Sequence, residues 1–430
     1  MAANAICLFI DGLHPGMIGA YGADWVETPN LDRLAVESFV ADQYLIDSLD
    51  PDLFLRSVLT GRSPLLGDDA EAFGALSLTQ RKNVQSAFVT DVPEQADVAR
   101  RHRFENVVTL RPSTAESPAD SIEETHFLSA FSEIVDILIQ SIESLQDDDS
   151  ERSLLLCCHL AGMAGPWDAP LAEREKYREE DDPEPMEGVT PPSLFLPPDF
   201  DPDDLLRFTH AYAAQIATMD ACIGGLLEWL ETSGTLDDTL LIVSSLRGFP
   251  LGEHRRVGLG EEEPYTEFRH VPLMVRMPDT SGASVRSQAL LHPGDLYATL
   301  DDWFSSDEAT KGLFPLIREE VETLRQRLIL IGANREISFR TPAWLMRPKD
   351  VRLTSGSDET LLDGELDETA WSLFAKPDDH WEVNDVTDRC VRIVEELIET
   401  CDETVAAIES GPDAVSALLP LSDDLVEGLE

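Results

Sequence analysis

Short runs of consecutive apolar residues, each ended by a turn or a polar side chain, recur along most of this sequence. They occupy residues 5–10, 84–90, 104–110, 153–158 and 240–244. Runs of this length are typical of strands that are buried on both faces in a parallel sheet. The first run ends at Asp11, where α/β sheets place ligand-binding carboxylates, although a turn or cap residue is also compatible with that place.

Apolar residues spaced three or four positions apart predict helices between these strands. The predicted helices span residues 121–145, 203–233, 318–327 and 390–410, and one further strand is expected at 328–332. A Ser-x-x-Glu capping box at Ser121 and Glu124 precedes the first of these helices. Another short helix is expected after Thr28, which can cap it, because Pro29 suits the first helical turn.

The composition indicates a folded protein with an unusual charge. With 430 residues and 43% hydrophobic residues, the chain can bury a large core, which excludes general disorder and favours one large domain plus a smaller one. Its 83 Asp+Glu against 32 Lys+Arg give a formal net charge of −51. This charge repels nucleic acid and anionic membranes, and it repels sulfate or phosphate monoesters unless it is locally reversed. Two interpretations remain open: a solubility or salt adaptation of the surface, or an acidic face for a basic protein partner.

The cysteines and the N-terminal segment indicate in which cellular compartment the protein is expected. The six cysteines include no C-x-x-C pair and no zinc spacing, a usage that fits a reduced interior better than a disulfide framework. The N-terminal apolar run has no basic region before it and is too short for a signal peptide or a transmembrane segment. We therefore expect a soluble, cytoplasmic protein that binds neither nucleic acid nor membrane.

Residues 44–62, YLIDSLDPDLFLRSVLTGR, carry the most informative motif. Their end, V-L-T-G-R, resembles the close of the sulfatase signature C/S-x-P-S-R-x-x-L-x-T-G-R. In that family the first signature residue is the nucleophile, and the first arginine assists it. Counting back from Arg62, the nucleophile position holds Pro51 and the arginine position holds Leu55. Proline has no nucleophilic atom and leucine has no charge.

Further segments resemble sulfatases in the family's order. They are YG…TPNLDRLA at 21–35, the helix at 212–230, L-G-E-H at 251–254, the segment 265–276, the helix at 290–304, the strand pair at 335–347 and the segment 372–386. The resemblance covers about residues 5–400. It implies an alkaline-phosphatase-like α/β fold with a large, mostly parallel sheet between helices, and a small C-terminal α+β subdomain with antiparallel strands. The expected divisions are 1–310, with an acidic, proline-rich surface excursion at 171–204, then 311–410, and an acidic tail at 411–430.

The resemblance also locates a divalent cation site, whose expected ligands are largely absent. Sulfatases usually have two adjacent aspartates where this chain has Asp11 and Gly12. The second half of that site falls on Leu246 and Arg247, because L-G-E-H fixes the alignment without gaps. Leucine cannot ligate, and a protonated guanidinium repels a cation. No cofactor is therefore expected, and Ca²⁺ or another divalent cation is expected only if the site is rebuilt.

Two interpretations of Arg247 remain open. It pairs with a leftover carboxylate such as Asp11, or it takes the place of the cation and binds an anion directly, with His254, Arg255 and Arg256 nearby.

The groups that hold the sulfate in the family are also absent. No lysine or histidine follows the strand at 84–90, and the histidine of the family's D-P-H-x-P-W loop falls on Ala164. His159, five residues earlier, is the candidate substitute, unless it is a structural histidine at a strand end.

These losses predict a catalytically inactive member of the sulfatase family with a binding or regulatory role. One alternative is a sulfate or phosphate ester hydrolase with a rebuilt site. It would use Ser48, Asp50 or Asp52 as nucleophile, together with Asp11 and His159. The other alternative is an anion-binding module that uses Arg247.

Overall fold

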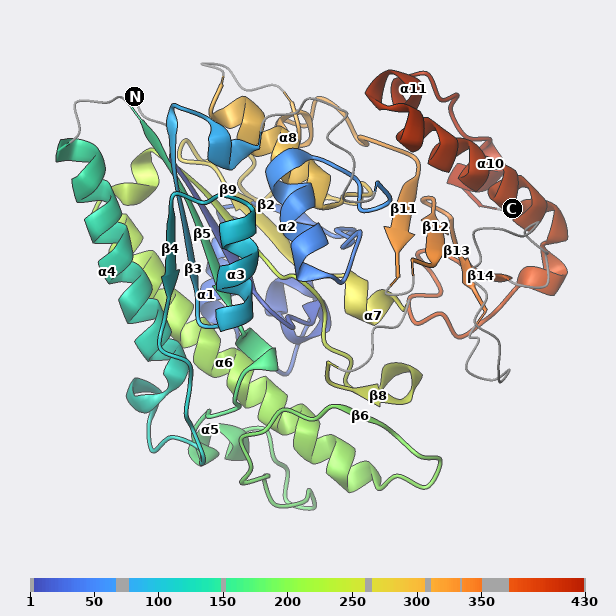
Figure 1. Ribbon diagram of the computed structural model, residues 1–430. Helices are drawn as coiled ribbons and strands as arrows, with labels where there is room; N and C mark the ends of the chain where they lie inside the picture. Colours follow the sequence, from blue (N-terminus) through green and yellow to red (C-terminus); the bar gives the residue numbers. More distant parts are fainter. Residues whose placement is uncertain are drawn as a thin grey trace.

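The computed structural model describes residues 4–66, 77–147, 152–259, 265–305, 311–332, 335–349 and 371–428. Its largest element is an eight-stranded sheet with the order β10-β2-β9-β7-β1-β5-β3-β4 (Figure 1). In chain order these strands are β1 Asn4–Ile10, β2 Phe39–Ala41, β3 Val84–Thr90, β4 Asn106–Thr109, β5 Ser153–Leu160, β7 Thr239–Ser244, β9 Leu273–Arg276 and β10 Arg286–Ser287. Of these eight strands only β9 runs antiparallel to its neighbours, so the sheet is mostly parallel, as the continuous apolar runs predict.

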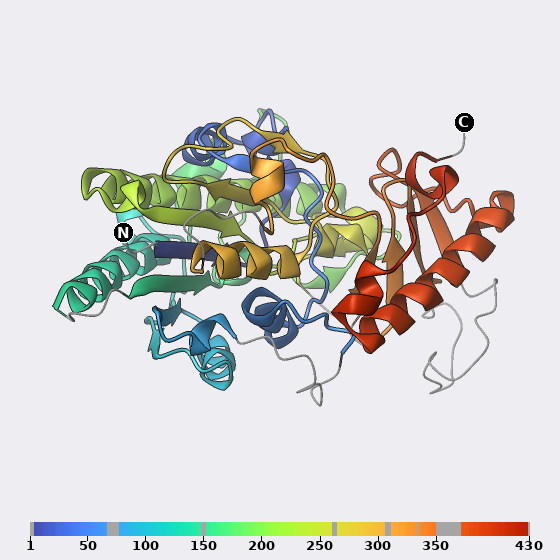
Figure 2. The same cartoon turned by 90° about the horizontal axis from the view of Figure 1, so that it is seen from above.

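Helices cover both faces of this sheet (Figure 2). Successive side chains of β1 point to opposite faces and enter two different apolar clusters. Ile6, Leu8 and Ile10 join the cluster formed with α1 Pro29–Val36, α4 His126–Asp147 and α6 Pro202–Thr232. Ala5, Cys7 and Phe9 join the cluster formed with α2 Pro51–Thr60, α3 Pro93–Arg101 and α8 Pro293–Trp303. Burial on both faces explains why the central strands carry apolar residues at consecutive positions.

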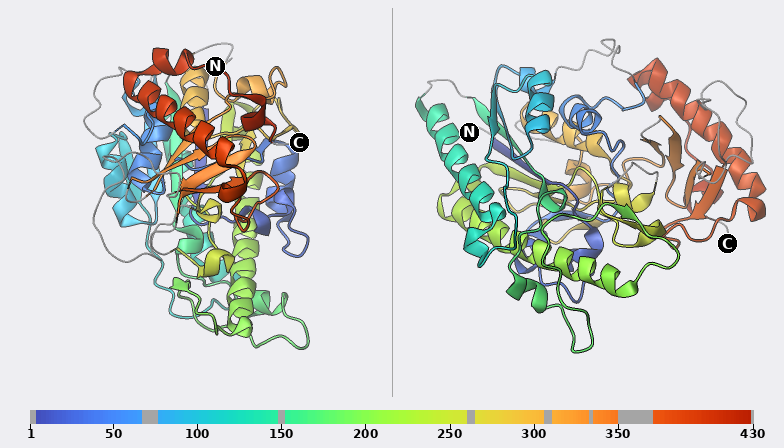
Figure 3. Two further views of the ribbon diagram at one scale, coloured as in Figure 1. Left: turned by 90° about the vertical axis from the view of Figure 1, so that its right-hand side faces the viewer. Right: turned by 60° about the horizontal axis from the view of Figure 1, so that its bottom comes forward.

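A second, smaller sheet follows α8 and α9 Phe314–Ile317. It is antiparallel, with β11 Leu328–Ile331, β12 Ile337–Arg340, β13 Trp344–Pro348 and β14 Trp371–Ala375 in that order. Helix α10 Val391–Ser410 packs across one of its faces (Figure 3). The acidic C-terminal segment folds back as α11 Pro412–Ser416 and α12 Asp423–Val426, where Trp344 Nε1 donates to the Asp424 carbonyl at 2.8 Å.

The acidic, proline-rich segment before α6 has little regular structure but is anchored. It contains α5 Leu171–Glu175 and β6 Leu194–Phe195, which pairs with β8 Arg256–Val257. The side chain of Arg174 is fully buried there and donates hydrogen bonds to the carbonyls of Trp167, Met186 and Gly188. Burial lowers the pKa of Arg174 to about 10.

Two predicted helix caps are wrong, because carboxylates from distant segments cap these helices. The backbone N–H groups of Asn30 and Leu31 in α1 donate to Asp220 of α6, while Thr28 bonds Gly19 and Asp32 instead. Helix α4 begins at His126, whose N–H donates to Asp168 at 2.7 Å. The expected capping box at Ser121 and Glu124 lies in a separate 3-10 turn, Ile122–Glu124.

The helix predicted at residues 318–327 is also wrong, since this stretch contains only turns and bends after α9. Leu324 packs against the apolar cluster of the large sheet, and Arg325 pairs with Asp295 at the start of α8. These tertiary contacts hold the segment along α8 and override its helical pattern.

None of the helices in the described parts of the chain is long and apolar enough to cross a membrane. All six cysteines are free, and five of them are buried.

Candidate functional site

The carboxyl ends of four neighbouring parallel strands define the candidate site. The strands lie in the order β7-β1-β5-β3, so the residues that follow β1 and β7 are neighbours at one edge of the sheet. Asp11 follows β1 and Arg247 follows β7. His159 lies inside β5, which extends two residues further than the sequence predicts.

Arg247 and Asp11 form a closed ion pair. Arg247 Nε lies 3.0 and 3.1 Å from the two Asp11 oxygens, and Nη2 lies 2.8 Å from Oδ2. The Asp11 side chain is 6% exposed and that of Arg247 is 26% exposed. The backbones support this pair, because Gly12 N donates to the Arg247 carbonyl at 3.1 Å. Both oxygens of the Asp11 carboxylate therefore face a guanidinium.

Leu246 and Leu55, which occupy the positions that the resemblance assigns to a metal-ligand aspartate and to the signature arginine, are buried. They are 4% and 1% exposed. Both belong to the apolar cluster on the α2 side of the sheet, and this cluster also contains Phe9 and Phe54. The rings of Phe9 and Phe54 pack edge to face with centroids 5.3 Å apart. Two positions that carry polar chemistry in the resemblance are thus part of the hydrophobic core.

The nucleophile position is the start of a helix. Pro51 is the first residue of α2, and Asp50 caps the helix by accepting from Asp52 N at 2.8 Å. Asp52 pairs with Arg101 and His102 at 2.6 Å each, and the hydrogen bond from His102 is the main reason that its pKa falls to about 2. Ser48 Oγ accepts from Asp50 N at 3.2 Å.

The three alternative nucleophiles are thus engaged in local structure. Within the described residues, no hydrogen bond or ion pair joins Ser48, Asp50 or Asp52 to Asp11 or His159.

His159 is buried rather than exposed on a loop. It is 2% exposed, its Nδ1 lies 2.9 Å from Thr90 Oγ1, and its Nε2 is buried without a hydrogen-bond partner. Burial lowers its pKa, so the neutral imidazole is favoured. Ala164, which takes the position of the family's loop histidine, lies in a 3-10 turn at Gly162–Ala164.

The other cationic candidates are held by neighbours of their own. His254 stacks on Tyr265 with centroids 3.7 Å apart, and its Nδ1 lies 2.8 Å from a Glu267 oxygen. Burial opposes protonation of His254, but Glu267 outweighs that effect and raises the pKa of the imidazole. Arg255 and Arg256 lie over the ring of Phe195, at 4.7 and 5.1 Å.

The divalent cation that the fold implies does not fit these residues. A hard cation needs about six oxygen ligands, several of them carboxylates. Here Asp11 is neutralised by Arg247, Asp91 at the end of β3 accepts from Ala161 N at 2.8 Å, and Leu246 is a buried leucine. Across the described residues, no three His, Cys, Asp or Glu side chains converge as metal ligands.

The end of the signature has a structural role. Gly61 ends α2 with a φ of +67°, a conformation that glycine adopts without strain. A Cβ at Gly61 would lie 2.5 Å from the ring of Tyr297 in α8, so only glycine allows α2 and α8 to approach this closely. Thr60 Oγ1 donates to the Arg56 carbonyl at 2.7 Å.

A cluster of histidines that sequence reasoning missed lies between the two sheets. His14, His270 and His380 line a cavity of about 180 Å³ together with Glu267 and other residues. His14 Nε2 lies 3.6 Å from Glu253. No spacing could have revealed this cluster, because its members come from separate segments of the chain.

The lowered pKa of His270 in this cluster predicts acid lability. Burial is the main reason that the pKa of His270 falls from 6.5 to about 3, and its Nε2 donates to the Asp42 carbonyl at 2.8 Å. The unfolded chain therefore binds a proton at pH 4 to 6 that the folded chain excludes, and the free energy of unfolding falls as the pH falls from about 6.5 towards 3. One such imidazole contributes up to about 1.4 kcal/mol per pH unit. Urea unfolding at pH 7 and pH 5 measures this effect, and His270→Gln should reduce the difference; an unchanged difference would contradict the assignment.

Comparison with known proteins agrees with the fold. The family model described as Sulfatase matches residues 3–306. The N-acetylglucosamine-6-O-sulfatase of Bacteroides thetaiotaomicron is 31% identical over 121 residues, which cover 27% of this chain and 21% of that protein. The human iduronate 2-sulfatase is 23% identical over 352 residues, which cover 68% of this chain and 62% of that protein. The chain thus spans less than two thirds of the length of either relative.

Solved structures resemble this chain over nearly its full length. The phosphonate monoester hydrolase of Agrobacterium radiobacter superposes with a TM-score of 0.68 at 14% identity, covering 95% of both chains. A protein solved with its substrate D-glucosamine-2-N,6-O-disulfate also gives a TM-score of 0.68, at 18% identity, covering 96% of this chain and 99% of its own. At these identities the likeness concerns the fold alone.

Proposed function

The chain belongs to the sulfatase family, and we propose that it is a member without hydrolytic activity that has a binding or regulatory role. The observation that carries the proposal is the ion pair between Asp11 and Arg247, at the positions that the resemblance assigns to the cation site of the family. The guanidinium of Arg247 neutralises the carboxylate of Asp11. At about 4 Å and an effective dielectric constant near 20, each unit of cation charge is repelled by about 4 kcal/mol.

The absence of a nucleophile supports the same proposal. Sulfatases form a covalent intermediate on an oxidised cysteine or serine, and a cation stabilises the ester. Pro51 offers no such atom, and Leu55 offers no charge for the developing anion. Removal of one member of a catalytic unit typically lowers kcat by several orders of magnitude. By the resemblance, the nucleophile, the arginine and most of the cation ligands are replaced together in this chain.

A binding role is consistent with the surface charge. The formal net charge of −51 leaves a strongly acidic surface around this core, and such a field attracts basic proteins and repels anionic substrates. A basic protein partner is therefore the class of partner that we propose.

The proposal predicts no turnover of sulfate, phosphate or phosphonate esters. Purified protein is assayed on 4-nitrophenyl sulfate, 4-nitrophenyl phosphate and a phenylphosphonate ester, each with Ca²⁺, Mg²⁺ or Mn²⁺. Hydrolysis should stay at the background rate, and metal analysis should find no stoichiometric cation. The control is Asp11→Ala, which separates contamination from true activity: turnover that this variant abolishes would sink the proposal and favour a rebuilt hydrolase.

An anion-binding module remains the second candidate, since part of the Arg247 side chain reaches solvent. To bind sulfate or phosphate with the same nitrogen atoms, Arg247 would have to leave Asp11.

A further inference from the structure

A large cleft lies at the other end of α2 from the nucleophile position. Its volume is about 1060 Å³, at the upper end of the range for ligand sites. It opens between the C-terminal end of α2, the start of α8 and the C-terminal helices α10 and α11. Because α2 has ten residues, Gly61 at the rim of the cleft is roughly 15 Å from Pro51 along the helix, and the described lining of the cleft does not include Asp11, His159 or Arg247.

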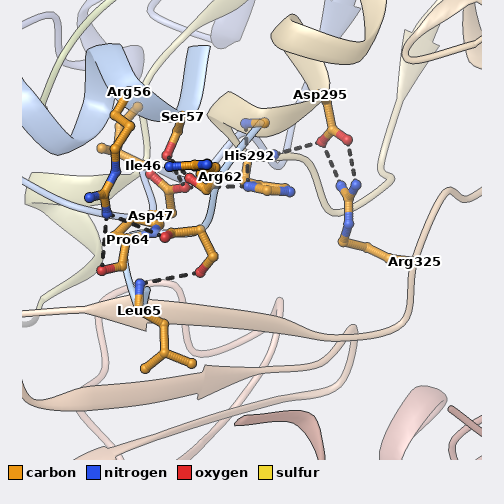
Figure 4. A network of polar contacts seen from close by, with 12 residues as sticks. Ile46, Asp47, Arg56, Ser57, Arg62, Pro64, Leu65, His292, Asp295 and Arg325 are labelled. Atoms are coloured by element: carbon orange, nitrogen blue, oxygen red, sulfur yellow. Dashed lines mark hydrogen bonds and ion pairs between the residues drawn. The ribbon is translucent and has the colours of Figure 1, made fainter. Parts of the chain in front are cut away.

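One wall of the cleft contains a buried carboxylate with an oxygen that lacks a partner. The Asp47 side chain is 3% exposed, and its Oδ2 lies 2.9 Å from Ser57 Oγ. Its Oδ1 is buried and has no hydrogen-bond partner. The imidazole of His292 approaches Oδ2 only to 3.5 Å (Figure 4).

A buried donor without a partner lies beside this carboxylate. Arg62 also lines the cleft, and its Nε is buried without a hydrogen-bond partner. Ser57 ties the two residues together, because its Oγ is 2.9 Å from Asp47 Oδ2 and 3.1 Å from the Arg62 carbonyl oxygen (Figure 4). A buried polar atom without a partner costs about 1–3 kcal/mol, so this acceptor and this donor, whose residues both line the cleft, mark a place for a polar ligand group.

The rest of the cleft is mostly apolar. Its apolar lining includes Leu324, Leu328, Ile329, Ile408, Val415 and Leu419. Leu419 is 80% exposed and Val415 is 42% exposed, so these rim side chains have no apolar cover of their own. A ligand with an apolar body would bury them.

The charges at the polar end exclude a charged head group. A carboxylate head group would be repelled by the carboxylate of Asp47, and an ammonium head group would be repelled by the guanidinium of Arg62. Arg325 does not change this balance, because it is paired with Asp295. Arg327 donates to the Leu419 carbonyl.

We propose that this cleft binds a neutral amphiphile with a hydroxyl head and an apolar chain. The hydroxyl proton is donated to Asp47 Oδ1, and the hydroxyl oxygen accepts from Arg62 Nε. The chain covers Val415 and Leu419. The proposal does not depend on whether the chain hydrolyses esters, because it concerns the cleft at the C-terminal end of α2 and not the strand ends that carry Asp11 and Arg247.

Three probes of equal chain length test the head group: 1-octanol, octanoate and octylammonium. Isothermal titration calorimetry with the full chain should show the tightest binding for 1-octanol. Tighter binding of octanoate or octylammonium would overturn the neutral head. No binding of any probe would overturn the site, and a water molecule would then be the partner of the two orphan atoms.

Surface variants locate the binding without disturbing the core. Leu419→Asp should weaken 1-octanol binding by roughly tenfold. This change corresponds to about half of the free energy gained when a leucine side chain is fully buried. The matched control is Val383→Asp, because Val383 is 74% exposed in the same C-terminal part of the chain but does not line the cleft. Asp47→Asn should also weaken binding, because it replaces the ionised acceptor with a neutral amide. Equal affinity of the Leu419→Asp and Val383→Asp proteins would contradict the location.

Discussion

Replacing Leu55 by arginine, the residue that the family signature has at this position, is expected to lower the free energy of unfolding by about 4 kcal/mol or more. Leu55 is 1% exposed and packs in the apolar cluster with Phe9, Phe54 and Leu246. The new guanidinium would be buried without a carboxylate partner, and it would also overpack the cluster. Urea unfolding of the wild type and of Leu55→Arg measures the difference.

The control for this variant is Leu55→Met, which keeps the volume and should cost less than about 1.5 kcal/mol. A small loss for Leu55→Arg would show that the position opens to solvent. In that case the former arginine site would still be a pocket, and the hydrolase alternative would gain support.

The sequence predicts the central parallel strands of the large sheet well, because these strands follow from local patterns. The apolar runs place β1, β3, β5 and β7 within two residues of their observed ends. The alignment through L-G-E-H places Arg247 at the strand edge, where it reaches Asp11. Parallel strands with short carboxyl-end loops leave little freedom at this edge.

What the sequence does not predict depends on contacts between distant segments. The α1 helix is capped by Asp220 and the α4 helix by Asp168, so local capping rules point to the wrong residues. Residues 318–327 do not form the predicted helix, and Arg325 in this segment pairs with Asp295 at the start of α8. The cleft is equally non-local, since Asp47, Arg62 and Leu419 come from opposite ends of the chain. None of these features has a periodicity that a pattern could detect.

Arg247→Met is expected to lower the free energy of unfolding by about 3 kcal/mol, because it leaves the buried carboxylate of Asp11 unpaired. The double variant Asp11→Asn with Arg247→Met should lose less than the sum of the two single variants, with a coupling of about 1–3 kcal/mol. Urea unfolding of all four proteins gives this coupling. If the losses of unfolding free energy were strictly additive, the ion pair would not stabilise the carboxyl ends of β1 and β7.

Arg247→Met also separates the proposed function from its alternatives. The proposed function expects no ligand at Asp11 and Arg247, the anion-binding module expects sulfate or phosphate, and the rebuilt hydrolase expects a divalent cation. If the pair is a closed structural lock, sulfate, phosphate and Ca²⁺ should each leave the melting temperature of the wild type unchanged, since neither side chain is free for a ligand. Ca²⁺ should not stabilise Arg247→Met either, because a single carboxylate beside the buried Leu246 cannot supply the oxygens that the ion needs.

Stabilisation of the wild type by sulfate that Arg247→Met removes would favour the anion-binding module. Stabilisation of the wild type by Ca²⁺ would mean that Arg247 moves aside for a cation, and that result would favour the rebuilt hydrolase.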